Sequence, residues 1–352
     1  MLDKAQVICL TGFLVAQFSL NSLYSPLMLM GWVGLAGASF CVYLGSDEIK
    51  RPAWVFNALI FLQISQLLAV PGSYVWGNGN WVLTAGVVLW TLPMPLVYLA
   101  VNRQIERCMC TFAIVHAFTI IVQGFTNYHW VGDIVIREGS PTGFSHNPNL
   151  AAGLLVMCLP FTIKGRWLWA AIPLLAAIIF TGSRWAFIVA GIIVLSMGYK
   201  NVISLKWVLG GVLSLLGGIV IMGMFTPFTA AVVASNSIAE AFTIASQIEV
   251  RLGMAGWPNL LPYGIAETDG LHNVPMRMAA EFGVISAAIW IALTIWALTK
   301  HRYTPAWWLM IAVALLSILD HYTWRPHLMG FWFVALGLLS IAESKSIPYK
   351  SS

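Results

Sequence analysis

The densest group of chemically versatile side chains in this sequence lies at positions 267–283, in the stretch "ETDGLHNVPMRMAAEFG". Only 9% of the residues in the whole chain are charged, yet this stretch contains Glu267, Asp269, His272, Arg277 and Glu281. Histidine is the side chain that changes charge nearest neutral pH, so His272 could take a proton from an attacking hydroxyl group, or simply be solvated in a loop. Glu267 and Asp269 could bind a divalent cation through their oxygens, but two carboxylates alone do not establish a metal site.

The elements that must position these residues are membrane helices. The chain has 352 residues, of which 59% are hydrophobic, and its mean hydropathy is +0.83. A soluble domain has roughly a quarter of its residues charged, so this composition predicts an all-α polytopic membrane protein that forms one membrane domain over residues 1–352. The net charge of +5 then reflects membrane topology, and we expect no binding of nucleic acid.

Apolar runs recur along the whole chain at lengths that suit membrane spans. A hydrocarbon core of about 30 Å needs roughly 20 apolar residues per helix. The first run lacks a clear small-residue cleavage site, so we interpret it as a span and not as a removed signal peptide. We predict about twelve transmembrane helices, at residues 6–24, 27–45, 52–70, 81–101, 108–127, 147–163, 167–182, 185–199, 207–226, 278–299, 305–320 and 327–343.

The distribution of basic residues gives these helices an orientation. With the N-terminus in the cytoplasm, the inner segments hold thirteen of the 18 Lys and Arg residues, which obeys the positive-inside rule. We therefore expect both termini in the cytoplasm of a bacterial cell, in its inner membrane. Two of the predicted outer loops are long, at residues 128–146 and 227–277. The second is a large periplasmic loop between the ninth and tenth predicted spans, and it contains short interfacial helices.

All of the basic residues on the predicted outer side are arginines. They are Arg137, Arg184, Arg251, Arg277 and Arg325, whereas every lysine is on the inner side. Arginine presents a planar fork that binds phosphate or carboxylate through two hydrogen bonds, so this pattern favours an anionic ligand at the outer face. The alternatives are chance and structural ion pairs, such as a bridge from Arg251 to Glu249 or Glu240. Arg184 lies between two apolar runs, where it either snorkels to lipid headgroups or faces an anion.

A further polar segment, "GFSHNPN", occupies residues 143–149. Asn147 and Pro148 are typical of the cap and first turn of a helix, and a capped helix start explains the pair without any ligand. Alternatively, His146, Asn147 and Asn149 also line a polar pocket. The sequence leaves both interpretations open.

Taken together, these segments resemble the bacterial O-antigen ligase and O-antigen polymerase family. Members of that family have a Gly-Phe-x-x-Asn-Pro-Asn segment at the start of a helix and a Ser-Arg pair between two helices, which "GFSHNPN" and "GSRWAF" match. In that family a large periplasmic loop ends in His-Asn followed by Glu-x-Gly, which "LHN" and "EFG" match, and Arg251 stands where the loop has an arginine. The resemblance covers roughly residues 143–335.

The resemblance implies a membrane-integral glycosyltransferase of the C superfamily with part of its active site in the 227–277 loop. Its donor would be a glycan on undecaprenyl pyrophosphate and its acceptor a lipid or glycan hydroxyl, such as a lipid A core sugar, with membrane lipids around it. We expect an inverting reaction that needs no metal and no cofactor. The implied catalytic residues are His272 as base, Arg184 and Arg251 on the pyrophosphate, and Glu281, which would orient His272 or position the acceptor. The candidate substrate-binding residues are Asn147, Asn149, Asn273, Arg325, Arg137 and Arg277.

Two other functions remain open at this point. An O-antigen or polysaccharide polymerase differs from a ligase only in its acceptor, which would be another lipid-linked repeat. A transporter or flippase belongs to a different class and predicts internal repeats, broken helices and ionisable residues near the membrane midplane. The charges of this sequence lie at the predicted outer edge instead, which disfavours transport.

Overall fold

The structure is a computed structural model of the chain. It describes residues 2–18, 26–45, 51–75, 81–126, 141–145, 147–163, 165–200, 273–319 and 326–342, with a few separate positions between 203 and 213. These parts of the chain are helical and contain no β-strand.

The helices of the first half are α1 (Leu2–Phe18), α2 (Pro26–Gly45), α3 (Ala53–Leu67), α4 (Ala69–Val75), α5 (Trp81–Thr91), α6 (Met94–Ala100) and α7 (Ile105–Thr126). Next come α8 (Pro148–Ile163), the 3-10 helix η2 (Gly165–Ala170), α9 (Ala171–Phe180) and α10 (Arg184–Tyr199). The last described helices are α13 (Val274–Phe282), α14 (Val284–Thr299), α15 (Pro305–Leu319) and α16 (Pro326–Ala342).

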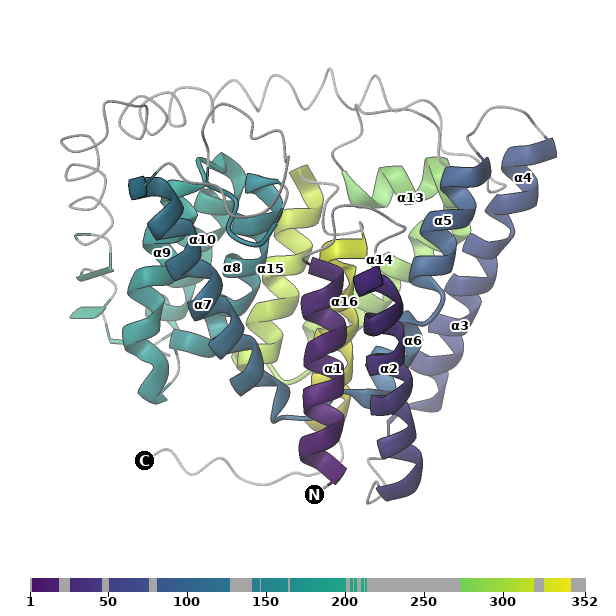
Figure 1. The fold of residues 1–352 in the computed structure, drawn as a ribbon, viewed down its shortest axis with the longest axis horizontal. Helices are drawn as coiled ribbons and strands as arrows, with labels where there is room; N and C mark the ends of the chain where they lie inside the picture. The colour runs from purple at the N-terminus through teal and green to yellow at the C-terminus, as the bar shows by residue number, and fades with distance from the viewer. Residues whose placement is uncertain are drawn as a thin grey trace.

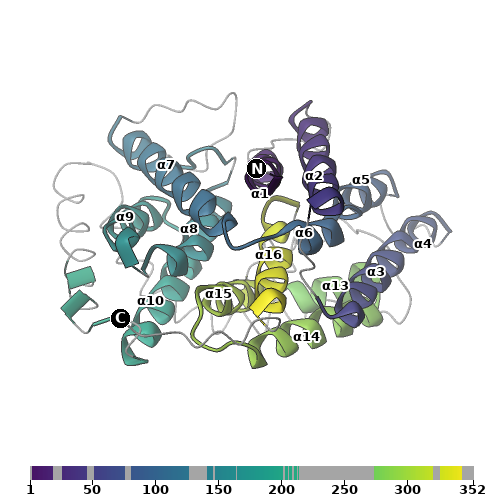
Figure 2. The ribbon, with the colours of Figure 1, turned by 90° about the horizontal axis from the view of Figure 1, so that it is seen from below.

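Most of these helices run side by side, while α13 lies crosswise at one end of the others (Figure 1). Seen along the helices, α15 and α16 stand in the middle of the described part (Figure 2). Helices α7 to α10 lie to one side of them, and α3 to α6 lie to the other (Figure 2). Helix α15 contacts α8, α10, α13, α14 and α16. It therefore packs against helices from distant parts of the sequence.

Within the described residues, three helical segments are long and apolar enough to cross a membrane: Ala53–Val75, Trp81–Ala100 and Ile105–Thr126. Several shorter apolar helices of 10 to 17 residues accompany them, among them Pro148–Ile163 and Val284–Thr299. The chain is thus a helical protein with segments suited to a bilayer, as its composition predicts.

The predicted start of the tenth span was wrong. One apolar run at 278–299 suggested a single helix, but the structure divides it at Gly283 into α13 and α14. Gly283 has φ 86° and ψ 157°, a backbone conformation that is essentially restricted to glycine. Because the break separates the two helices, Glu281 lies in the last turn of the short α13 and not one or two turns into a span.

Candidate functional site

The three polar segments singled out in the sequence each lead into a helix. The "GFSHNPN" segment ends with the first two residues of α8, "GSRWAF" contains the first turn of α10, and "LHN" ends at the residue before α13. All three helices pack against α15. Three stretches that are far apart in the chain therefore have one structural neighbour in common.

Helix α7 holds the turn that precedes α8. The side-chain oxygen Oε1 of Gln123 accepts hydrogen bonds from the backbone N–H groups of Thr142 at 3.1 Å and Gly143 at 2.7 Å. Its Nε2 donates to the carbonyl oxygen of Gly143 at 3.1 Å, and Nδ1 of His116 accepts from the N–H of Phe144 at 3.3 Å. Polar groups in an apolar bundle need partners, and these hydrogen bonds all go to backbone groups of the turn that precedes α8.

Gly143 and Phe144 fit this position for separate reasons. Gly143 has φ 62°, in the left-handed region, and a Cβ atom at this position would collide with the ring of His116. The Phe144 ring stacks on His116 with centroids 5.8 Å apart and on Phe112 with centroids 6.3 Å apart. The Gly-Phe pair thus has a structural explanation that involves no ligand.

Asn147 caps α8. Its Oδ1 accepts a hydrogen bond from the N–H of Asn149 at 2.8 Å, and its carbonyl oxygen accepts from the N–H of Ala151 at 3.0 Å. Pro148 is the first helical residue, where its missing N–H would have no partner within the helix. The capped helix start is confirmed, so Asn147 uses its side-chain oxygen to start α8, and the binding role of Asn147 and Asn149 stays a prediction.

The α9–α10 turn places Arg184 at the first position of α10. Gly182 follows Thr181, the C-cap of α9, and has φ 67°, the left-handed conformation common just after a helix. Ser183 then occupies the extended N-cap position of α10. Trp185 fixes the new helix in place, because its indole Nε1 donates to the carbonyl oxygen of Leu315 on α15 at 3.0 Å. The structure thus describes the backbone of Arg184 at a helix start, where positive helix dipole charge and anions attract each other, but it does not describe the Arg184 side chain.

Asn273 performs two tasks at the start of α13. Its Oδ1 accepts from the N–H of Met276 at 3.0 Å, which is a standard helix cap. Its Nδ2 donates to the carbonyl oxygen of Ile318 at 3.0 Å, in the last turn of α15. Because the amide has a partner at each end, the structure gives Asn273 an anchoring role, and contact with substrate stays a prediction.

Two of the segments meet at the same turn of α15. Trp185 bonds to Leu315 and Asn273 bonds to Ile318, and these two carbonyls are three residues apart, so they are neighbours on the helix surface. Trp185 directly follows Arg184, and Asn273 directly follows His272 in the sequence. The end of α15 therefore anchors the residues adjacent to a predicted phosphate ligand and to the predicted base.

A buried ion pair lies on α13. Nε of Arg277 contacts Oε1 of Glu281 at 2.7 Å, and the two side chains are only 4% and 5% exposed. Residues four apart share a helix face, and a buried charge is stable only with such a partner. Nη1 of Arg277 is buried and has no hydrogen-bond partner among the described residues. Arg277 is therefore held in place by Glu281 while it keeps donor capacity.

Several predicted site residues lie outside the described residues. They are His272, Arg251, Arg137, Arg325 and His146, together with Glu267 and Asp269 and the rest of the 227–277 loop before residue 273. Among the residues that are described, no three His, Cys, Asp or Glu side chains gather in a way that could hold a metal ion.

Sequence reasoning missed the anchors Trp185, His116 and Gln123. A tryptophan one residue after a helix start looks like an ordinary interfacial aromatic residue. His116 and Gln123 are seven residues apart and therefore share a face of α7, which was a signal that they meet a common partner. The identity of that partner could not be derived, since it comes from a different segment of the chain.

The sequence was also compared with known proteins. No protein-family model and no curated protein matches this chain.

Proposed function

We propose that this chain is a membrane glycosyltransferase that moves a glycan from undecaprenyl pyrophosphate to a sugar hydroxyl, as an O-antigen ligase does with lipid A core as acceptor. The observation that supports this most is the convergence of segments on α15. Residues next to Arg184 and His272, 88 positions apart, are hydrogen-bonded to one turn of one helix. A phosphate ligand and a base must be close to one another to act on the same glycosidic bond.

The proposal includes the topology predicted from charge. The chain would cross the bacterial inner membrane about twelve times, with both termini in the cytoplasm and the start of α13 at the periplasmic face. In this orientation the first turns of α8 and α10 also face the periplasm. Glycans on undecaprenyl pyrophosphate in the outer leaflet would then reach these helix starts without crossing the membrane.

The chemistry follows from the residue types. An acceptor hydroxyl oxygen attacks the anomeric carbon, its proton passes to His272, and the bond between that carbon and the pyrophosphate oxygen breaks. The leaving pyrophosphate gains negative charge, which Arg184 and Arg251 stabilise. Attack opposite the leaving group inverts the anomeric configuration. These steps need neither a metal nor another cofactor.

The ion pair on α13 refines the part played by Glu281. Its carboxylate neutralises Arg277 at 2.7 Å, so we propose that Glu281 acts by holding the guanidinium. Arg277 is then a candidate ligand for the second phosphate, because its Nη1 has no partner among the described residues. Arg137 and Arg325 stay candidate phosphate ligands on the grounds of residue type and predicted side alone.

Reconstitution tests this function directly. Purified protein in liposomes receives a glycan on undecaprenyl pyrophosphate, once with lipid A core and once without. A ligase transfers the glycan only when core is present, whereas a polymerase lengthens the lipid-linked glycan without it. Movement of the intact donor between leaflets, with no new glycosidic bond in either sample, would replace the proposal with transport.

A further inference from the structure

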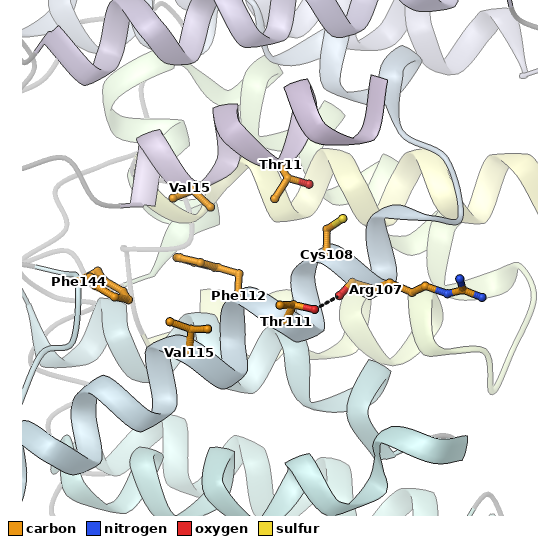
Figure 3. Close-up of a pocket in the computed structure, with 8 residues that line it drawn as sticks. All are labelled: Thr11, Val15, Arg107, Cys108, Thr111, Phe112, Val115 and Phe144. Atoms are coloured by element: carbon orange, nitrogen blue, oxygen red, sulfur yellow. Dashed lines mark hydrogen bonds between the residues drawn. The ribbon is translucent and has the colours of Figure 1, made fainter. Parts of the chain in front are cut away.

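A groove runs between α1 and α7 on the outside of the helix bundle. Its volume is about 560 Å³, and its lining comes from Thr11 and Val15 on α1, five residues of α7, and Phe144 (Figure 3). A volume of this size lies in the usual range for small-molecule sites. The segment 105–126 that forms one wall is among those long enough to cross a membrane, so lipid is the natural surrounding of the groove.

The inside of the groove is apolar even where its residues carry hydroxyl groups. Thr11 donates its hydroxyl to the carbonyl oxygen of Val7 at 2.7 Å. Thr111 donates to the carbonyl oxygen of Arg107 at 3.0 Å (Figure 3). Hydroxyls satisfied within their own helices leave little for a polar ligand to bind. The stacked rings of Phe112 and Phe144 add further apolar surface.

One end of the groove is cationic. Arg107, in the first turn of α7, is exposed and extends its guanidinium away from the apolar residues (Figure 3). The first turns of α1 and α7 and the turn before α7 carry Lys4, Arg103 and Arg107 against Asp3 and Glu106, which gives this end a net positive charge. An apolar channel that leads to an exposed arginine at the end of a membrane helix matches a chain with an anionic head.

We infer that this groove binds one acyl chain of an anionic phospholipid, whose phosphate is bound by Arg107. Arginine suits the phosphate because its planar fork can donate two hydrogen bonds. None of the residues that line the groove is among the proposed catalytic or substrate-binding residues, and lipid binding here can be tested independently of glycan transfer. We call it the α1/α7 lipid site.

Lipid titration of the purified protein in detergent, followed by native mass spectrometry, tests the charge. We expect phosphatidylglycerol to bind about fivefold more tightly than phosphatidylcholine with identical acyl chains, since one basic residue near an anionic lipid contributes about that factor. Arg107→Ala should abolish the preference. Arg103→Ala is the matched control, because Arg103 is exposed nearby but does not line the groove, and it should retain most of the preference. Equal binding of both lipids, or equal loss in both variants, would overturn the proposal.

A second pair of variants tests the groove itself. Val15→Trp fills it, whereas Val33→Trp adds the same bulk at a site on α2 that is 65% exposed. Only Val15→Trp should displace the lipid. As a separate measurement, a phospholipid with a photoactivatable acyl chain should label α1 and α7 in the wild-type protein. Lipid binding that is the same in both variants, labelling spread evenly over all helices, or a lipid-free dimer that dissociates on Val15→Trp would each exclude a lipid site here.

Discussion

Trp185 and Asn273 are 88 positions apart in the sequence and donate hydrogen bonds to the same turn of α15, at Leu315 and Ile318, each over 3.0 Å. One anchor is the second residue of α10 and the other is the cap of α13. The relative position of these two helix starts is therefore set by α15. Any reaction that needs both Arg184 and His272 depends on this arrangement.

Two substitutions at Asn273 separate its two tasks. Asn273→Ala removes the cap and the bond to Ile318, and we expect a loss of about 1–2 kcal/mol in the free energy of unfolding. Asn273→Asp keeps an oxygen for the cap but loses the donor, so α13 should still form while its contact with α15 weakens. Thermal unfolding in detergent and glycan transfer are the measurements. An Asp variant with wild-type transfer would show that the bond to α15 does not position the site.

The ion pair on α13 predicts strong non-additivity. Removing one partner leaves an unpaired charge in a buried place, so Arg277→Met or Glu281→Gln alone should each lower the free energy of unfolding by roughly 3 kcal/mol. The double variant Arg277→Met/Glu281→Gln should lose less than the sum of the two, because neither charge remains. A double-mutant cycle measured by thermal unfolding checks this, and additive effects would mean that the two groups do not interact.

Gly143 and Gly191 form a matched pair. Gly143→Ala puts a Cβ against His116 in a left-handed conformation and should cost about 1–3 kcal/mol in stability. At Gly191, within α10, an added Cβ meets nothing within 4 Å, so alanine there should be neutral or stabilise the helix by up to about 1 kcal/mol. Equal melting temperatures of the two variants would argue against the His116 contact.

His272 is the proposed base, so His272→Ala should abolish glycan transfer while the protein still binds the donor. The result follows because only the proton acceptor is removed and the arginines remain. Donor binding is measured with the labelled lipid-linked glycan, and transfer is followed by gel mobility of the product. Full transfer by this variant would exclude the assignment.

Arg184→Lys keeps a positive charge but loses the planar fork. Because Arg184 is proposed to bind pyrophosphate, this variant should reduce turnover about tenfold or more. Arginine donates two charge-assisted hydrogen bonds to one phosphate, whereas lysine would donate only one. Arg302→Lys, at an exposed position that follows α14, is the control and should retain normal turnover. Unchanged kinetics in Arg184→Lys would mean that Arg184 only snorkels to lipid headgroups.

The sequence alone determined the local features of this protein. Composition predicted helices suited to a membrane, and the Asn147–Pro148 pair correctly predicted the start of α8, because caps and hydrophobic runs depend on residues close together in the chain. The break at Gly283 was missed, since a glycine with positive φ leaves no mark in the sequence of a largely apolar run. Only the tertiary structure decided that Trp185 and Asn273 share a turn of α15, and that His116 and Gln123 hold a loop. Such contacts join segments up to 130 residues apart, and no local pattern specifies which carbonyl a given side chain will reach.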